Sequence, residues 1–314
     1  RALDTDFNTL VGASTTGDIN ITDEDGLEVT SLTAGNGNIN LASETGNILV
    51  GQVTASTAGK TVRITAEDGG IRDNVANTTV NVSATNLELA ATNGIGTGSN
   101  ALDTTIDNLV VDVTGGDVFL NETNSITLED VSNSAGDFTL VAQAGNITVD
   151  TVSVSNDISL TANTGAILDD NVNSTRISGD TLNLVAATGI GTSGAVSTRA
   201  LDTNVAELNA EVTGAGAINV AELNGMAIGT VRSTDGDITL VSNSGNLNVG
   251  AITAGAEGNT VTLYAAAGAI RDRSNDNVAD VTATNLALSA ASGIGTSSNS
   301  FDTNVDQLVA TTGT

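Results

Sequence analysis

The chain has 314 residues, and its 37 acidic and 9 basic residues give a formal net charge of -28 at pH 7, which repels nucleic acid and anionic membrane surfaces. It contains no Cys, His, Pro or Trp. This composition excludes disulfides, thiolate metal sites, thiol nucleophiles and histidine bases, and we expect neither catalytic residues nor an organic cofactor.

Apolar residues that alternate with a period of two predict β-strands from the N-terminus onward. The first such pairs are Ile19 and Ile21, Leu27 and Val29, Ile39 and Leu41, Ile48 and Val50, Val62 and Ile64, and Leu87 and Leu89. Asn, Glu and Arg stand inside most pairs, which predicts one buried and one solvated face. No stretch has a helical period or the roughly 18 to 20 consecutive apolar residues of a membrane helix, so we expect an all-β chain without membrane insertion.

Gly followed by Asp or Asn and an apolar residue marks the expected corners between strands. Because Gly and Asn or Asp tolerate positive φ, each triplet turns directly into a strand. We expect corner asparagines to stack amide on amide from coil to coil, with Asn36, Asn38, Asn47 and Asn93 as candidates. The triplets occupy residues 17–19, 37–39, 46–48, 116–118, 136–138, 145–147, 236–238 and 245–247.

One phrase, Leu-Asp-Thr before a strand-like run, returns at Asp4, Asp103 and Asp202 and, with Phe for Leu, at Asp302, at intervals of 99, 99 and 100 residues. A fixed period predicts stacked units with one continuous core. We therefore predict one continuous parallel β-helix, a β-solenoid, over residues 1–314, with coils of about 20 to 25 residues. The repeats are approximately 1–99, 100–198 and 199–298, with a fourth starting at 299–314. Both ends share one phase of the repeat, so we expect a fragment of a longer array.

The Leu-Asp-Thr aspartates have two interpretations. They would form a carboxylate column along one side of the solenoid, where calcium or glycan hydroxyls bind. Alternatively, each side chain accepts backbone N–H groups at a turn, and we favour this structural role.

Gly-Ile-Gly-Thr also recurs in each repeat. A phosphate loop is excluded because no helix follows and the nucleotide-binding lysine is missing. We predict structural corners in which the isoleucine points inward. The glycines are Gly94, Gly96, Gly189, Gly191, Gly293 and Gly295.

A second acidic set, Asp73, Asp169 and Asp272, follows an apolar corner, with Arg72 and Arg271 beside two of its members. Arginine beside aspartate on a solenoid resembles the active site of pectin-cleaving lyases, which use carboxylate-bound calcium and an arginine base. The recurrence of the acidic residue in every repeat instead favours a structural role.

Further acidic clusters, which include Asp23 with Asp25 and Asp169 with Asp170, are weak candidates for calcium ligands. None fits a helix-loop-helix calcium loop or the nonapeptide of calcium-binding β-rolls. The net charge nevertheless predicts modest stabilisation by millimolar calcium.

The alternating strands, Gly-Asn-Ile corners and Gly-Ile-Gly-Thr loops resemble the repeat region of filamentous haemagglutinin-like bacterial surface proteins along the whole chain. The resemblance implies a right-handed parallel β-helix that projects from the surface of Gram-negative cells and supports adhesion, aggregation or biofilm building. The N-terminal secretion-recognition domain of that family has no counterpart here.

These observations lead to an extracellular, cell-surface fibre segment as the first hypothesis. Its expected partners are other copies of itself, end to end or lateral, or further repeats of the same chain. A second hypothesis is a calcium- or glycan-binding protein that joins cells, and a remote third is a polysaccharide-active enzyme. The enzyme would need one coil with a unique cluster of Asp, Arg and Lys, and the sequence offers none.

Overall fold

The computed structural model describes residues 3–5, 8–172, 176–191 and 200–313, and their regular secondary structure consists of strands and isolated bridges. Within these ranges no helix is long and apolar enough to cross a membrane. Contacts divide the chain into two compact units, Arg1–Gly145 with Thr151–Asn156 and Asn146–Asp150 with Asp157–Thr314. Each unit is a parallel β-solenoid, which confirms the predicted fold class. The predicted single domain over residues 1–314 stays a prediction.

The strands of the first unit include every segment that the sequence predicts before residue 91. They are β1 (Leu3–Thr5), β2 (Thr9–Ser14), β3 (Ile19–Asp23), β4 (Leu27–Ala34), β5 (Ile39–Ser43), β6 (Ile48–Ala55), β7 (Thr61–Ala66), β8 (Ile71–Asp73), β9 (Val82–Ser83), β10 (Asn86–Ala91), β11 (Leu102–Thr105), β12 (Asn108–Val113), β13 (Val118–Glu122), β14 (Ile126–Asn133) and β15 (Phe138–Ala142). The next strand, β16 (Ile147–Val154), spans the boundary between the units.

The second unit repeats the pattern with several longer strands. They are β17 (Ile158–Ala162), β18 (Ala166–Asp169), β19 (Ile177–Ala186), β20 (Gly189–Ile190), β21 (Leu201–Ala215), β22 (Ile218–Glu222), β23 (Met226–Asp235), β24 (Ile238–Ser242), β25 (Leu247–Ala254), β26 (Thr260–Ala265), β27 (Ile270–Asp272), β28 (Val281–Ala290) and β29 (Thr303–Thr312).

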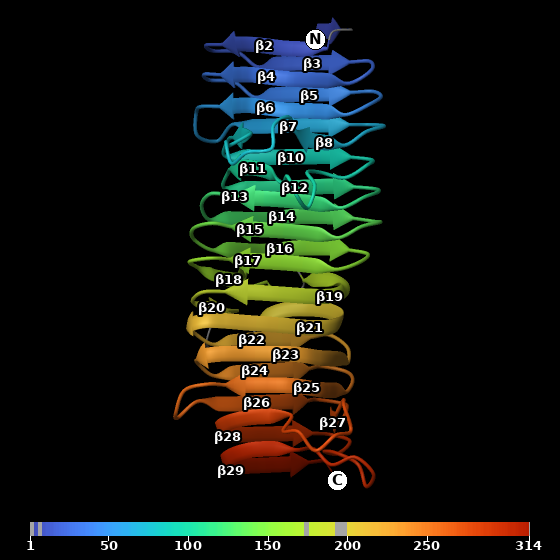
Figure 1. Cartoon of the computed structure of the whole chain (residues 1–314), viewed down its shortest axis with the longest axis vertical. Coiled ribbons are helices and arrows are strands. Elements are labelled where there is room, and N and C mark those ends of the chain that lie inside the picture. Colours follow the sequence, from blue (N-terminus) through green and yellow to red (C-terminus); the bar gives the residue numbers. More distant parts are fainter. Residues whose placement is uncertain (1–2, 6–7, 173–175, 192–199, 314) are drawn as a thin grey trace. The chain divides into compact units, whose positions relative to one another are not determined.

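Two parallel ladders run through the first unit. One joins β1, β3, β5, β7, β10, β12 and β14. The other joins β2, β4, β6, the short pair β8 and β9, and then β11, β13 and β15. Consecutive strands alternate between the ladders, except for β8 and β9, which share one, so β4 and β6 point opposite to β3, β5 and β7 (Figure 1). One coil is therefore two strands and two corners.

Stacked aliphatic side chains fill the space between the ladders. In the first ladder Ile19, Ile39, Val62 and Leu87 lie in register, at steps of 20, 23 and 25 residues. The last three are fully buried. Along most strands buried and more exposed residues alternate, as in β5 and β10. The predicted coil length and the predicted alternation are both confirmed.

The first and third repeats each contain an odd number of half-coils, and this places the two Leu-Asp-Thr phrases of each unit on opposite ladders. In the first unit Asp4 lies in β1, which pairs with β3, whereas Asp103 lies in β11, which pairs with β13. In the second unit Asp202 pairs with β22, whereas Asp302 directly precedes the part of β29 that pairs with the start of β28. Within each unit the two phrases therefore do not lie in a column along one side, which is the less favoured of the two interpretations.

One coil per repeat is interrupted by a corner loop. In the first unit β6 pairs with β8 through residues 48–50 and with β9 through residues 53–54, and residues 74–81 form the loop between β8 and β9. In the second unit β25 pairs in the same way with β27 and with the start of β28, around residues 273–280. These loops lie beside the predicted acidic residues.

Candidate functional site

A fully buried glutamate accepts a hydrogen bond from the threonine of the second Leu-Asp-Thr phrase. Glu122, at the end of β13, accepts hydrogen bonds from the Thr104 hydroxyl at 2.7 Å, the Ile106 N–H at 3.2 Å and the Asn124 N–H at 3.0 Å. Burial raises the pKa of Glu122, and these hydrogen bonds oppose the rise. The arrangement fastens two adjacent coils, β11 and β13, through their interior.

The next repeat reproduces this arrangement at Glu222. Its carboxylate, also fully buried, accepts from the Thr203 hydroxyl at 2.8 Å, the Val205 N–H at 3.0 Å and the Asn224 N–H at 2.9 Å, and burial raises its pKa. The threonine of the phrase thus has a structural role that the sequence analysis assigned only to the aspartate.

Asp23, a weak calcium candidate, occupies the same place in the first repeat. It ends β3, is fully buried and lies 99 residues before Glu122. The backbone N–H of the exposed Asp25 lies 3.4 Å from Asp23 Oδ1. An acidic residue at one strand end in every repeat is a periodic signal that the sequence analysis missed.

The corner triplets connect coils through side-chain oxygens. Asp18 Oδ1 accepts the Asn38 N–H at 2.7 Å, and Asn38 Oδ1 in turn accepts the Thr61 N–H of the next coil at 3.0 Å. Asn47 Oδ1 accepts the Gly70 N–H at 2.8 Å. The predicted amide-on-amide stacking is therefore wrong at Asn38 and Asn47, where a backbone donor takes the place of the second amide.

Amide pairs do occur between neighbouring coils, but on the half-buried side of the strands. Asn40 donates to Asn20 at 2.6 Å, and Asn108 donates to Asn86 at 2.9 Å. Here the period-two alternation, not the corner, brings the side chains into register.

The Gly-Ile-Gly-Thr segments are tight corners. All six glycines, Gly94, Gly96, Gly189, Gly191, Gly293 and Gly295, have positive φ. A Cβ atom at Gly94 would lie 2.5 Å from the Asp117 carbonyl oxygen of the next coil, so a side chain is excluded there. The intervening Ile95 and Ile190 are fully buried, whereas Ile294 is half-buried.

Arg72, the arginine beside Asp73, belongs to the same corner. Its guanidinium donates to the carbonyl oxygens of Gly94 and Asn93, at 2.7 Å each, and of Ile71 at 3.1 Å. Burial lowers its pKa. The geometry assigns this arginine to capping a glycine corner.

The first-repeat corner loop gathers three polar residues, all more than nine-tenths buried. Asn81 donates to Asp73 Oδ1 at 2.7 Å, and its own Oδ1 accepts the Asp103 N–H at 2.8 Å. Asp103 also accepts from the side chain of Asn121 at 3.2 Å. Burial first, and then the charge of Asp73, raises the pKa of Asp103.

The second repeat brings Asp169 and Asp202 together in its own corner. Asp169 Oδ2 accepts the Asn171 N–H at 2.7 Å, and burial with the charges of Asp202 and Asp170 raises its pKa to about 6. Burial also raises the pKa of Asp202, while the positive charge of Arg176 opposes that rise. Asp170 Oδ1 accepts the Val172 N–H at 3.0 Å.

The third repeat has three aspartates at this corner. Asp280 Oδ2 accepts the Asp302 N–H at 2.8 Å, and Asp272 Oδ1 accepts from the Ser274 N–H at 2.7 Å and its hydroxyl at 3.0 Å. Burial, aided by the charges of Asp272 and Asp302, raises the pKa of Asp280 to about 7. Asp280 is 1% exposed.

The structure thus brings together the two acidic sets that the sequence analysis treated separately, Asp73 with Asp103, Asp169 with Asp202, and Asp272 with Asp302. Sequence reasoning missed the third position, the residue directly before β9, β19 and β28, which is Asn81, Arg176 and Asp280 in turn. The side chain of Asp4 lies outside the described part of the chain. Across the described ranges no group of three or more acidic side chains is arranged to hold a metal ion.

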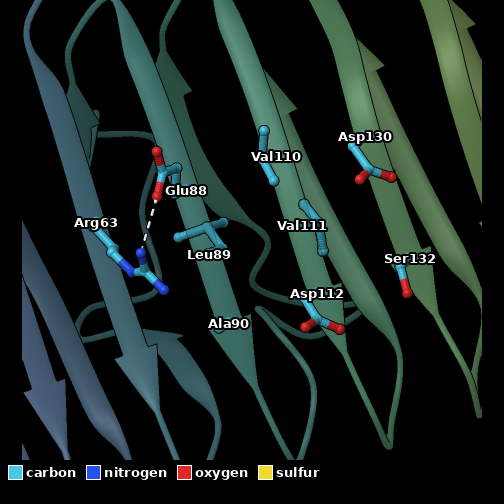
Figure 2. A pocket seen from close by; sticks show the side chains of 9 residues that line it. All are labelled: Arg63, Glu88, Leu89, Ala90, Val110, Val111, Asp112, Asp130 and Ser132. Carbon is cyan, nitrogen blue, oxygen red and sulfur yellow. Dashed lines mark ion pairs between the residues drawn. The ribbon is translucent and has the colours of Figure 1, made fainter.

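Shallow grooves cross the outer faces of the ladders. In the first unit a groove of about 400 Å³ crosses β7, β10, β12 and β14, where Arg63 and Glu88 form an ion pair at 3.4 Å and Asp112 and Asp130 lie on the following strands (Figure 2). In the second unit a groove of about 410 Å³ contains the ion pair of Arg232 with Glu211, at 3.2 Å. Both ion pairs are largely exposed.

The parallel ladders, oxygen-bonded corners and recurring buried carboxylates define the class of this protein, a β-solenoid repeat protein. No protein-family model, curated protein or solved structure matches the chain significantly.

Proposed function

We propose that this chain is a structural repeat segment of a bacterial extracellular fibre or filamentous adhesin, where it acts as a stiff spacer or filament body in adhesion and biofilm formation. One observation carries the proposal. The buried polar residues that recur with the repeat, such as Glu122 with Thr104 and Glu222 with Thr203, are bonded to adjacent coils of the solenoid itself.

The mechanical role follows from these bonds. Backbone ladders connect each coil to the next, and the corner oxygens and buried carboxylates add side-chain bonds in the same direction. To separate two coils, all of these bonds must break. The charge of -28 adds repulsion between neighbouring copies at low ionic strength.

The proposed partner is another coil of the same kind, from further repeats of the chain or from a second copy. The observation behind this is at β29, which pairs with β28 on one side. Leu308 continues the core column of Leu286, yet Leu308 is 52% exposed where Leu286 is 2% exposed. A coil stacked on β29 would bury this apolar side chain.

Surface location rests on the resemblance to filamentous haemagglutinin-like repeats in the strand, corner and loop pattern. We propose that the segment is exported and displayed outside the cell. Labelling of intact producing cells with an antibody against the segment tests this. Signal on intact cells is expected, and signal that requires permeabilised cells would contradict display.

The spacer role is tested by length. Negative-stain electron microscopy of the 314-residue chain and of a tandem of two copies should show elongated particles whose contour length doubles in the tandem. Long fibres formed by the single chain would identify self-assembly as the function. Compact particles that do not lengthen in the tandem would contradict a spacer or filament body.

A further inference from the structure

In the first repeat the side-chain amide of Asn81 is surrounded by three oxygen acceptors, and we use the word nest for this group of acceptors. Its Nδ2 donates to Asp73 Oδ1 at 2.7 Å, to the Val50 carbonyl at 2.8 Å and to the Gly51 carbonyl at 3.1 Å. Asn81 is 3% exposed. An amide NH₂ group is well suited to this place because it supplies donors to acceptors that water does not reach.

The third repeat builds the same nest in the same register. β25 pairs with β27 and β28 as β6 pairs with β8 and β9. The residue after the aspartate also bonds alike in both, because the Asn74 N–H donates to Val50 at 3.1 Å and the Arg273 N–H donates to Val249 at 2.9 Å. The counterparts of Asn81, Asp73, Val50 and Gly51 are, in this order, Asp280, Asp272, Val249 and Gly250.

The donor is lost in this second nest. Asp280 carries a carboxylate where Asn81 carries an amide, and the Asp280 and Asp272 carboxyl groups lie within hydrogen-bonding reach of each other. With both groups ionised neither can donate, and Asp280 Oδ1 is buried without a hydrogen-bond partner. A buried, unpaired carboxylate oxygen against a second carboxylate is unfavourable unless a proton or a cation lies between them.

The chain supplies a positive charge at the equivalent corner of the second repeat. There Arg176 stands directly before β19, as Asp280 stands before β28, and its positive charge acts on the carboxylate of Asp202. Near Asp280, Arg273 is engaged elsewhere, since its guanidinium lies 2.7 Å from Glu207. The three repeats therefore place an amide, a guanidinium and a carboxylate at one position.

We propose that the third-repeat corner binds a divalent cation, for which calcium is the matching ion, between the carboxylates of Asp272 and Asp280. Two carboxylates neutralise a divalent ion, and the remaining ligands available are the hard carbonyl oxygens of Val249 and Gly250. Calcium accepts irregular oxygen shells, whereas magnesium demands octahedral geometry and retains waters.

This inference does not depend on the proposed fibre role, because the site lies within one corner of the second unit. The experiment compares the intact 314-residue chain with Asp280→Asn, which restores the amide of the first repeat. The matched control is Asp276→Asn, which removes the same charge from the exposed part of the same loop. Thermal unfolding is recorded in EDTA and in about 1 mM calcium, and calcium stoichiometry is measured by titration calorimetry.

The expected result is a calcium-dependent rise in Tm in the intact chain and in Asp276→Asn, with one site by calorimetry, and loss of both in Asp280→Asn. In EDTA, Asp280→Asn should unfold at a Tm equal to or above that of the intact chain. An equal calcium response in all three proteins would overturn the proposal, because the ion would then act on the general surface charge. Absence of any calcium response, with acid stabilisation that Asp280→Asn removes, would also overturn it and assign the site to a shared proton.

The reciprocal variant tests whether the nest itself creates the site. Asn81→Asp gives the first repeat the chemistry of the third, and a second calcium site is expected by calorimetry. Circular dichroism in calcium checks that the variant is folded. A folded Asn81→Asp that binds no additional calcium would overturn the assignment to these residues.

Discussion

Glu122 and Asp280 are both buried carboxylates, but the fold treats them differently. Glu122 accepts bonds from a hydroxyl and two backbone N–H groups, whereas Asp280 accepts one backbone N–H through Oδ2 and its Oδ1 is unpaired. Burial raises the pKa of both groups. Where neighbouring coils provide donors, as at Glu122, the interior of the solenoid accommodates a carboxylate charge, whereas at Asp280 a proton or a cation would offset the missing donor.

The largest expected effect comes from removal of the satisfied carboxylate. Glu122→Ala leaves the Ile106 N–H buried without an acceptor, removes the shorter of the two bonds of the Thr104 hydroxyl and the bond of the half-buried Asn124 N–H, and opens a cavity. We expect a loss of about 3–5 kcal/mol in unfolding free energy, measured by urea denaturation.

The matched control for this change is Glu129→Ala, because Glu129 is an exposed glutamate on the neighbouring strand β14. It should shift the urea midpoint very little. A comparable shift in the two variants would show that the buried bonds contribute nothing beyond charge removal.

Acidification is expected to stabilise the fold in EDTA. The folded-state pKa of Asp280 is about 7 and that of Asp169 about 6, against an ordinary value of 3.8. The folded chain therefore binds protons that the unfolded chain has released, so stability is greatest at the acid end of this window and is lost as pH rises from about 4 to 7. Between pH 7.5 and pH 5 we expect a gain of about 2–3 kcal/mol from Asp280 and a smaller gain from Asp169.

Urea denaturation across this pH series measures the effect, and relief of the net negative charge acts in the same direction. The contribution of Asp280 is isolated by Asp280→Asn, which should flatten the profile. A profile that falls on acidification would contradict the raised pKa values.

A smaller effect is expected when one donor of the satisfied carboxylate is removed. Thr104→Val keeps the side-chain shape and deletes the hydroxyl that lies 2.7 Å from Glu122. We expect a loss of about 1–2 kcal/mol in urea denaturation, and a similar loss for Thr203→Val in the second unit. If either valine variant were as stable as the parent chain, backbone donors alone would suffice for that carboxylate.

The smallest effect is expected at an exposed carboxylate. Arg63→Ala removes the ion pair with Glu88, whose side chains are 57% and 42% exposed. Water replaces the lost partner, so we expect a change below about 0.5 kcal/mol that vanishes in high salt. A larger, salt-resistant loss would mean that Arg63 stabilises the sheet by packing along its aliphatic stem.

Much of the fold was predictable because its rules are local. The alternation at Ile39 and Leu41 defines a strand without knowledge of its neighbours, and a glycine such as Gly94 marks a corner by its backbone freedom. The ladder on which each phrase lies was not predictable in this way. It depends on the number of half-coils per repeat, and the corner loop between β8 and β9 hides one of them in the sequence.

The chemistry at the corners was only partly predictable. Asp73 and Asp103 both stood out by recurrence, but their meeting depends on coil stacking across 30 residues. Asn81, Arg176 and Asp280 share a position without sharing a side-chain type, so recurrence gave no signal there. The position of Glu122 could have been predicted from the sequence, because an acidic residue recurs at that phase in every repeat.

The odd number of half-coils in a repeat limits how many copies of the phrase one partner surface can contact. Within each unit the exposed surface beside one Leu-Asp-Thr phrase lies on the opposite ladder from the surface beside the next phrase. A single flat partner surface could not contact both, so a partner with two such surfaces would be expected to bridge neighbouring molecules.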